Sequence, residues 1–360
     1  MPGDVVLAEV RDAEGFARVI QEIGIRAGSD RPVFLIKPAW FSPHRANFTG
    51  ARELDLLLSC LPPGRRIVVE GYSGARNFGG REITPENAYD NWDWIREQDR
   101  AFRDRTGISE VLARHEAEYV NVTEEVWQGR VAPAESVREA VRRAYGPRGG
   151  ARAGAVIPRS DRHPAQGSGG EPGMEQLLEP AVAQEELFGV VPRCLFELRG
   201  SVLISLAKLK TGSWSLKNLF GLIPDPLRSR WHGEGGRMLG RSIVDIAAIY
   251  RALFPVVGIV EGIYETALYR SGGRYHTDWG DYDVVEDAGL VLAGWNLVTL
   301  DCCAARAVGS LEMGGRSFAR IGEQVFGEAA VVPRELADAL DRHACRLFGA
   351  LDAPGGAFGG

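Results

Sequence analysis

Short apolar runs alternate with amphipathic stretches along the first part of the chain. The apolar runs have the length of buried strands, and the stretches between them carry apolar residues at helical spacing. Alternation of this kind predicts strand–helix–strand units and a mostly parallel sheet. The expected strands are residues 4–9, 33–37, 66–70 and 118–122, and the expected helices are residues 13–24, 51–60 and 91–114.

The alternation stops at a segment rich in Gly, Pro, Arg and Ser and then resumes. Residues 146–174 have the composition of a long flexible loop. Beyond them the expected strands are residues 201–207, 256–260 and 289–293, and the expected helices lie near residues 214–221, 235–253, 296–309, 317–327 and 333–349.

The expected fold class is α/β, with a mostly parallel sheet flanked by helices. The expected organisation is an N-terminal α/β part (1–145), the flexible loop (146–174), a C-terminal α/β part that completes the domain (175–352) and a disordered tail (353–360). An arrangement in two lobes with the site between them is left open by the pattern alone.

Composition narrows the class of protein. The chain has 360 residues, 45% of them hydrophobic and 25% charged, which is typical of a soluble globular protein. A net charge of −6 argues against a nucleic-acid partner. No apolar run approaches the roughly 18 residues that span a bilayer, and the first residues lack a signal-peptide pattern. Five cysteines without C-x-x-C spacing exclude a standard iron–sulfur or zinc motif, so we expect a reducing, cytoplasmic location.

Four of the expected strands end in a charged residue: Lys37, Glu70, Lys208 and Glu261. The carboxyl ends of parallel strands meet at one edge of a sheet, and ligands bind in open α/β sheets beyond that edge. The pattern therefore predicts a site where these four side chains converge. The alternative, that each strand simply ends in a polar residue, is left open.

Lysine is rare in this chain and is clustered. Of 42 basic residues only four are lysines, at positions 37, 208, 210 and 217, and the other 38 are arginines. A lysine ammonium is a compact charge that suits phosphate or carboxylate. We therefore predict Lys208 and Lys210 as catalytic residues. The predicted substrate-binding residues are Lys37, Thr211, Ser213, Lys217 and Asn218. Because no Walker loop and no G-x-G-x-x-G fingerprint is present, no nucleotide or NAD site is expected.

Further polar and aromatic residues add to this hypothesis. Glu70, Glu261 and His44 are candidates for moving protons. Trp40 and Trp214 lie beside the lysine segments and are expected to form an aromatic wall for the apolar body of a substrate.

Two acidic clusters are candidate magnesium sites, since Mg²⁺ prefers oxygen ligands. One cluster holds Asp90 and Asp93, and the other holds Asp278, Asp281 and Asp283. Solvated acidic loops or helix caps are the alternative explanation for both.

The runs LISLAKLKT, SLKNLFGLIP, IVDIAAIYRALFPVVGIVEGI and GLVLAGWNLVTLDCCAARAVG resemble the domain-of-unknown-function 362 family over roughly residues 33–310. The resemblance implies an α/β fold. It also points to Lys37, Glu70, Lys208, Lys210, Thr211, Lys217, Asn218, Gly221 and Asp301 as matching positions. Many members carry a C-terminal ferredoxin-like cysteine segment, which is missing here, so no iron–sulfur cluster is expected.

Together these features predict an enzyme of specialised metabolism that acts on an anionic small molecule with an apolar body. Lysine and Mg²⁺ charges with carboxylate acid–base groups suit a lyase, a cyclase or an isomerase. The alternatives are a redox enzyme related to the iron–sulfur members and a non-catalytic protein that binds an anionic metabolite.

Overall fold

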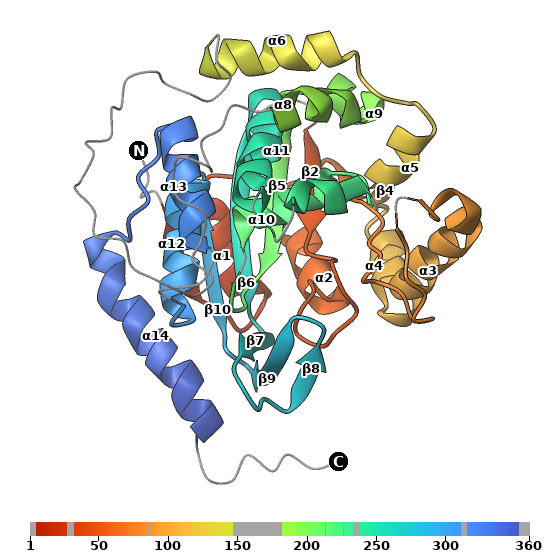
Figure 1. Cartoon of the computed structure of the whole chain (residues 1–360). Helices are drawn as coiled ribbons and strands as arrows, with labels where there is room; N and C mark the ends of the chain where they lie inside the picture. The colour runs from red at the N-terminus through yellow and green to blue at the C-terminus, as the bar shows by residue number, and fades with distance from the viewer. Residues whose placement is uncertain are drawn as a thin grey trace, which may run out of the picture.

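The computed structural model describes residues 5–26, 32–84, 86–146, 182–212, 214–225, 227–233, 236, 238–310 and 315–352 (Figure 1). The predicted loop beyond residue 146, the tail at 353–360 and Ser213 lie outside the described residues.

The centre of the fold is a seven-stranded sheet in the order β1-β10-β6-β5-β2-β3-β4. The five strands from β4 to β6 are parallel, while β10 and β1 at the other edge are antiparallel to their neighbours. The mostly parallel sheet that the sequence predicts is thus confirmed, and every one of its strands falls at a predicted position. Both halves of the chain contribute to this one sheet, so two separate lobes do not describe it. The strands are β1 (Val6–Glu9), β2 (Val33–Pro38), β3 (Arg65–Glu70), β4 (Glu118–Asn121), β5 (Val202–Lys208), β6 (Val256–Gly262) and β10 (Leu290–Gly294).

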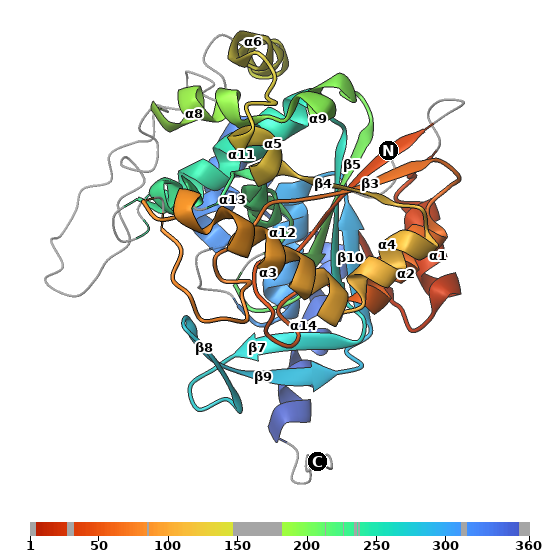
Figure 2. The ribbon, with the colours of Figure 1, turned by 90° about the vertical axis from the view of Figure 1, so that its right-hand side faces the viewer.

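Helices cover both faces of the sheet, as Figure 2 shows, with α1, α2 and α4 on one side and α11 and α13 on the other. The first layer consists of α1 (Ala13–Glu22), α2 (Ala51–Cys60), α3 (Trp92–Arg105) and α4 (Ile108–Arg114). The second consists of α5 (Val122–Trp127), α6 (Ala134–Tyr145), α8 (Val182–Leu187), α9 (Arg193–Glu197), α10 (Ser215–Leu219), α11 (Leu239–Leu253), α12 (Leu297–Ala307), α13 (Gly315–Phe326) and α14 (Arg334–Asp352). Four 3₁₀ turns, η1 (Tyr89–Asn91), η2 (Phe188–Val190), η3 (Phe220–Leu222) and η4 (Leu227–His232), complete the described elements.

Differences from the predicted helices have local causes. The single helix expected at residues 91–114 is divided into α3 and α4 by Gly107, whose φ of 75° leaves the helical region. The sequence prediction missed α5, α8 and α9, which have only five or six residues and are too short to show a helical repeat. It also missed α6, which buries Val137 and Val141.

Two separate apolar cores lie on the two faces of the sheet. Along β5, Leu203 and Ala207 pack on the side of α10 and α11, while Ile204 and Leu206 pack on the side of α2. This alternation continues to the end of the strand, because successive side chains of a strand point to opposite faces. It directs Lys208 toward α2.

A second sheet of three strands, in the order β7-β9-β8, follows the carboxyl end of β6 (Figure 1). Its strands are β7 (Glu265–Tyr269), β8 (Tyr275–Thr277) and β9 (Gly280–Glu286). The sequence was interpreted here as an acidic loop. The strands form because Tyr269, Tyr275 and Tyr282 stack across the sheet with ring centroids 5.1 and 5.3 Å apart.

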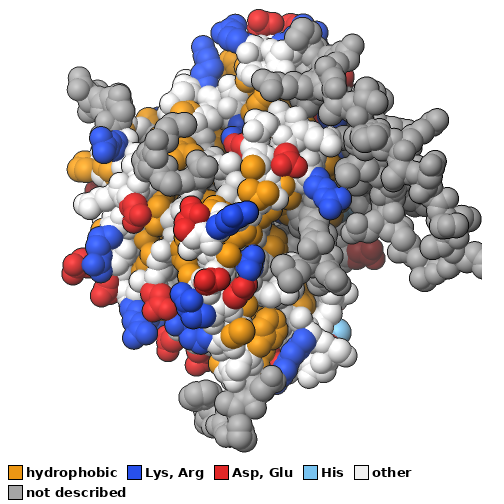
Figure 3. Space-filling model, turned by 90° about the vertical axis from the view of Figure 1, so that its left-hand side faces the viewer, with side chains coloured by type: hydrophobic (Ala, Val, Ile, Leu, Met, Phe, Trp, Pro, Cys, Tyr) orange, Lys and Arg blue, Asp and Glu red, His pale blue; other side chains and the backbone are white. Residues whose placement is uncertain are grey.

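The face shown in Figure 3 carries acidic and basic side chains side by side rather than a field of one sign. Ion pairs such as Arg306 with Asp341 join the outer helices α12 and α14. None of the described helices is long and apolar enough to cross a membrane. No disulfide joins the five cysteines, all of which lie within the described residues.

Candidate functional site

A pocket of about 400 Å³ lies at the point where the order of the parallel strands reverses. On one side of β2 the next strands are β3 and then β4. On the other side they are β5 and then β6, so the strand order runs in opposite directions on the two sides of the β2–β5 pair. Ligands bind at such a reversal in open α/β sheets. The pocket walls come from the carboxyl ends of β2, β3 and β5, from α10 and η4, and from β7 of the small sheet. Of the four strand-end side chains expected to converge, Lys37, Glu70 and Lys208 line this pocket, whereas Glu261 does not.

Lys37 is buried on the side of the sheet that carries α10. Its Nζ donates hydrogen bonds to Glu70 Oε2 at 2.9 Å, to the Pro38 carbonyl at 2.8 Å and to Asn218 Oδ1 at 3.2 Å. Burial lowers the pKa of Lys37, although the nearby Glu70 carboxylate acts in the opposite direction. All three protons of this ammonium are in use, so Lys37 holds the site together rather than offering its charge to a ligand.

Lys208 lies on the opposite side of the sheet and is held by two carboxylates. Its Nζ donates to Glu53 Oε1 at 2.8 Å and to Glu261 Oε2 at 3.1 Å. Burial alone would lower the pKa of Lys208, but the two carboxylates outweigh it and raise the pKa. Burial raises the pKa of Glu261 well above its ordinary value. Glu261 is fully buried behind Lys208 and is not among the residues that line the pocket.

Lys210 and Lys217 both line the pocket, and neither contacts a carboxylate in the described part of the chain. Lys210 Nζ donates one hydrogen bond, to the Asn47 carbonyl at 3.1 Å. Burial, followed by the charges of Lys217 and Lys208, lowers the pKa of Lys210 to about 7. Burial also lowers the pKa of Lys217. The charges of Lys37 and Lys208 are thus balanced by carboxylates, whereas Lys210 and Lys217 contact no carboxylate among the described residues.

A third cation, Arg228 on η4, adds to the positive charge of the pocket. Among the described residues its guanidinium donates to the backbone carbonyls of Ile223, Tyr72 and Gly221. His232 on the same turn lines the pocket, and burial lowers its pKa. The sequence interpretation missed both residues, because η4 shows no pattern that sets it apart from an Arg-rich surface loop.

Tryptophan side chains form part of the pocket wall, as expected. Trp40 and Trp214 are both 1% exposed, and their indole N–H groups donate to the carbonyls of Thr49 and Lys210. Trp279, which is 43% exposed, extends the wall from the small sheet. Because both rings are almost completely buried in the apolar cores, they support the pocket wall from behind, and the exposed aromatic surface of the pocket comes from Trp279 and Phe41.

The short helix α10, which carries Lys217 and Asn218, is anchored by Asp301 of α12. Asp301 accepts hydrogen bonds from the backbone N–H groups of Ser215 at 2.8 Å and Leu216 at 3.0 Å, and from the Ser215 hydroxyl. These are the orphan donors of a helix N-terminus, which a carboxylate satisfies well. Burial raises the pKa of Asp301 to about 7.

The remaining predicted residues lie apart from the pocket or at its rim. Thr211 lines the pocket, and its hydroxyl accepts a hydrogen bond from the Tyr269 backbone. His44 is outside the lining, with its ring 5.8 Å from that of Trp279.

The two acidic clusters do not converge on the pocket. Asp90 and Asp93 are exposed, and Asp93 pairs with Arg96 at 3.3 Å. Asp278 is exposed, while Asp281 binds His276 at 2.7 Å and Asp283 binds Arg270 at 2.6 Å. Among the described residues no group of three or more His, Cys, Asp or Glu side chains is arranged to hold a metal ion. The donor set therefore does not fit the expected magnesium site, which stays a prediction without support from these contacts.

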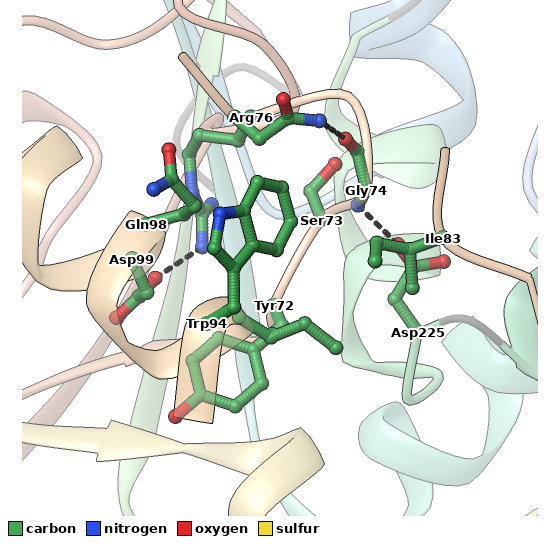
Figure 4. A pocket seen from close by; sticks show the side chains of 11 residues that line it. Tyr72, Ser73, Gly74, Arg76, Ile83, Trp94, Gln98, Asp99 and Asp225 are labelled. Atoms are coloured by element: carbon green, nitrogen blue, oxygen red, sulfur yellow. Dashed lines mark hydrogen bonds and ion pairs between the residues drawn. The ribbon is translucent and has the colours of Figure 1, made fainter. Parts of the chain in front are cut away.

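A second, much smaller hollow of about 20 Å³ adjoins the site (Figure 4). Arg76 crosses it to reach Asp99 at 2.5 Å, and the Gly74 N–H donates to Asp225 at 2.5 Å. A space of this size holds about one water molecule. The larger pocket is accordingly the candidate site.

Comparison with known proteins bears on the second half of the chain. The family model described as "Domain of unknown function (DUF362)" matches residues 191–306, which confirms the expected resemblance over that stretch. The matched stretch contains β5, Lys210, Lys217, Arg228, β6 and Asp301. The N-terminal part of the chain is not covered by the match. No curated protein and no solved structure matches the chain.

Proposed function

From the family match over residues 191–306 and the charge balance of the pocket, we propose that this protein is an enzyme of specialised metabolism. Its substrate is an anionic small molecule with an apolar body, bound beyond the carboxyl ends of β2 and β5. The observation that carries the proposal is that Lys210 and Lys217 line the pocket and contact no carboxylate of the residues that the structure describes.

Electrostatics explains why an anion is needed. Lys37 and Lys208 are balanced by Glu70, Glu53 and Glu261. Removing a further ammonium from water costs several kcal/mol unless an opposite charge compensates it. A substrate carboxylate or phosphate placed between Lys210 and Lys217 would supply that charge.

The pocket also has the size and walls for an apolar group. Its volume falls within the range of small-molecule sites. The exposed rings of Trp279 and Phe41 suit an aryl or prenyl body, and aromatic faces also stabilise a cation that develops on such a body.

These groups suit a lyase, cyclase or isomerase. Fixed ammonium groups stabilise negative charge that develops on a departing group or on an enolate oxygen. A group whose pKa is near 7 both accepts and donates protons at neutral pH, which is the property of Lys210. Glu70 lines the pocket and is the candidate for a second proton transfer, whereas Glu261 contacts Lys208 and does not line the pocket. The proposal assigns no step to Mg²⁺.

The proposal retains the expected cytoplasmic location, a small-molecule partner rather than nucleic acid, and the absence of NAD and of an iron–sulfur cluster. A purified protein that is coloured and contains iron would favour the redox alternative instead.

The test measures binding and turnover of a panel of anionic aryl and prenyl compounds, by calorimetry and by mass spectrometry of the products. Lys217→Ala should weaken binding at least tenfold, and Lys210→Ala should abolish turnover. Arg143→Ala, which removes one exposed positive charge from α6, is the matched control and should change neither. Full activity in both lysine variants would overturn the proposal, and binding without turnover of any compound would identify a carrier protein.

A further inference from the structure

We propose that Lys210 is a nucleophile that forms an imine with a carbonyl group of the substrate, while Lys217 binds the anionic group of the same molecule. The substrate class is then an anionic carbonyl compound, such as a 2-oxo acid with an aryl or alkyl body. This inference rests on the proposed function and names its substrate class and its covalent step.

The backbone of Lys210 is fixed from two sides. The residue forms a parallel bridge with Ala267 of β7, and its carbonyl accepts the indole N–H of Trp214 at 2.8 Å. The side chain therefore leaves a rigid position directly after β5 and enters the pocket. A fixed nucleophile loses little entropy when it reaches the bond-forming geometry.

Within the ranges that the structure describes, the Lys210 amine makes one polar contact, and that contact suits a nucleophile. Nζ donates to the Asn47 carbonyl at 3.1 Å, and a carbonyl oxygen can only accept. This contact uses one N–H bond and leaves the lone pair of the neutral amine directed elsewhere. Asn47 is itself held in place, since its Oδ1 accepts the Tyr269 hydroxyl at 2.8 Å.

The other lysines are less suited to attack a carbonyl. Lys37 has three hydrogen bonds, and Lys208 is held between two carboxylates that stabilise its charged form. No carboxylate of the described residues contacts Lys210, which lies near the charges of Lys208 and Lys217 and has its pKa lowered to about 7. A desolvated lysine beside another cation is the arrangement that activates an amine for imine formation. Lys217, farther along on α10, is left to hold the anion.

The step balances without an additional cofactor. The neutral amine adds to the carbonyl carbon to give a carbinolamine. The carbinolamine hydroxyl takes up one proton from solvent and leaves as water with the carbonyl oxygen, which gives the protonated imine. The imine withdraws electrons from a neighbouring C–H bond, whose proton passes to a base, or from a C–C bond, whose other fragment leaves as carbon dioxide or as a carbonyl compound. After a proton forms the new C–H bond, one water adds to the imine and releases the carbonyl product, the free amine and the proton taken up at the start.

Reductive trapping tests the inference on the full-length protein. The protein is incubated with phenylpyruvate and sodium borohydride, which reduces an imine to a stable secondary amine, and the product is mapped by peptide mass spectrometry. Since the chain has only four lysines, the modified position is unambiguous. We expect one adduct, on Lys210. Lys217→Met should leave the site of modification unchanged but raise the phenylpyruvate concentration for half-maximal trapping at least tenfold.

Two variants of Lys210 and a calorimetric binding measurement separate failure of the imine proposal from failure of the anion site. Lys210→Arg retains the positive charge but not the nucleophile, so it should give no adduct while it melts at the wild-type temperature. Lys210→Met also lacks the amine and should likewise give no adduct. If phenylpyruvate binds by calorimetry but no adduct forms on Lys210, or if the adduct lies elsewhere, the imine is wrong and the anion site stands. If phenylpyruvate and the whole panel of anions fail to bind, both proposals are wrong.

Discussion

Glu53 on α2 and Lys208 at the end of β5 are 155 residues apart in the sequence, and their Oε1 and Nζ atoms lie 2.8 Å apart in the fold. Both side chains are buried, and Glu261 of the neighbouring strand completes the cluster. The contact joins α2 to the carboxyl end of β5. It keeps Lys208 charged near Lys210, whose charged form is destabilised by burial.

Removal of the Lys208 ammonium from its cluster with Glu53 and Glu261 should lower the free energy of unfolding. Lys208→Met leaves Glu53 and Glu261 buried together without a cation, and we expect a loss of about 3–5 kcal/mol in the free energy of unfolding. Adding Glu53→Gln to that variant should recover part of the loss, since it removes one of the two buried negative charges. Urea unfolding of the two single variants and the double variant measures the coupling. Strictly additive effects would contradict the cluster.

Lys210 should make the stability of the protein depend on pH. The unfolded chain keeps this proton to about pH 10.5, but the folded protein keeps it only to about pH 7. Between these values the unfolded state binds more protons, so the free energy of unfolding rises with pH. Lys210→Met removes the burial cost and should stabilise the protein by about 2–4 kcal/mol below pH 7, and progressively less as the pH approaches 10.5. Thermal melts at pH 6 and pH 9 measure the difference, and an equal gain at both would contradict the lowered pKa.

Asp301 should stabilise the fold through α10. Asp301→Ala leaves the backbone N–H groups of Ser215 and Leu216 buried without acceptors, and we expect a loss of about 2–4 kcal/mol in unfolding free energy. Anion binding should also weaken, because α10 carries Lys217. Asp341→Ala, which breaks a largely exposed ion pair with Arg306, is the control and should cost at most about 1 kcal/mol. Equal losses in the two variants would show that Asp301 does not anchor α10.

Gly221 is needed because the chain passes close to Lys37. A Cβ atom at this position would lie 2.8 Å from Lys37 Nζ and 3.1 Å from Glu70 Oε1. Gly221→Ala should therefore displace the Lys37–Glu70 pair, with a loss of about 1–3 kcal/mol. Gly189→Ala, where a Cβ meets nothing within 4 Å, is the matched control. Calorimetric melts of both variants give the comparison, and identical melting temperatures would refute the close approach.

Much of the fold could be predicted from the sequence. The seven strands of the main sheet and its mostly parallel order follow from the alternation of apolar runs and amphipathic stretches. The small sheet could not be predicted, because its strands are short and its stability comes from tyrosines that stack only after the chain has turned back. Glu53 could not be recognised either, because an acidic residue in the first turn of a helix is common on ordinary exposed helices.

The local sequence pattern is enough to place Lys37, Lys208 and Lys210 at the carboxyl edge of the sheet, because each lies within two residues of the end of a parallel strand. Lys217 reaches the pocket through α10, which Asp301 anchors. Tertiary contacts determine which of the four lysines have a carboxylate beside them to balance their charge. Carboxylates from α2, β3 and β6 reach Lys37 and Lys208, and none in the described residues reaches Lys210 or Lys217. The physical reason is that the cost of a buried charge depends on partners brought together by long-range packing, which the residue's own neighbours in the chain do not specify.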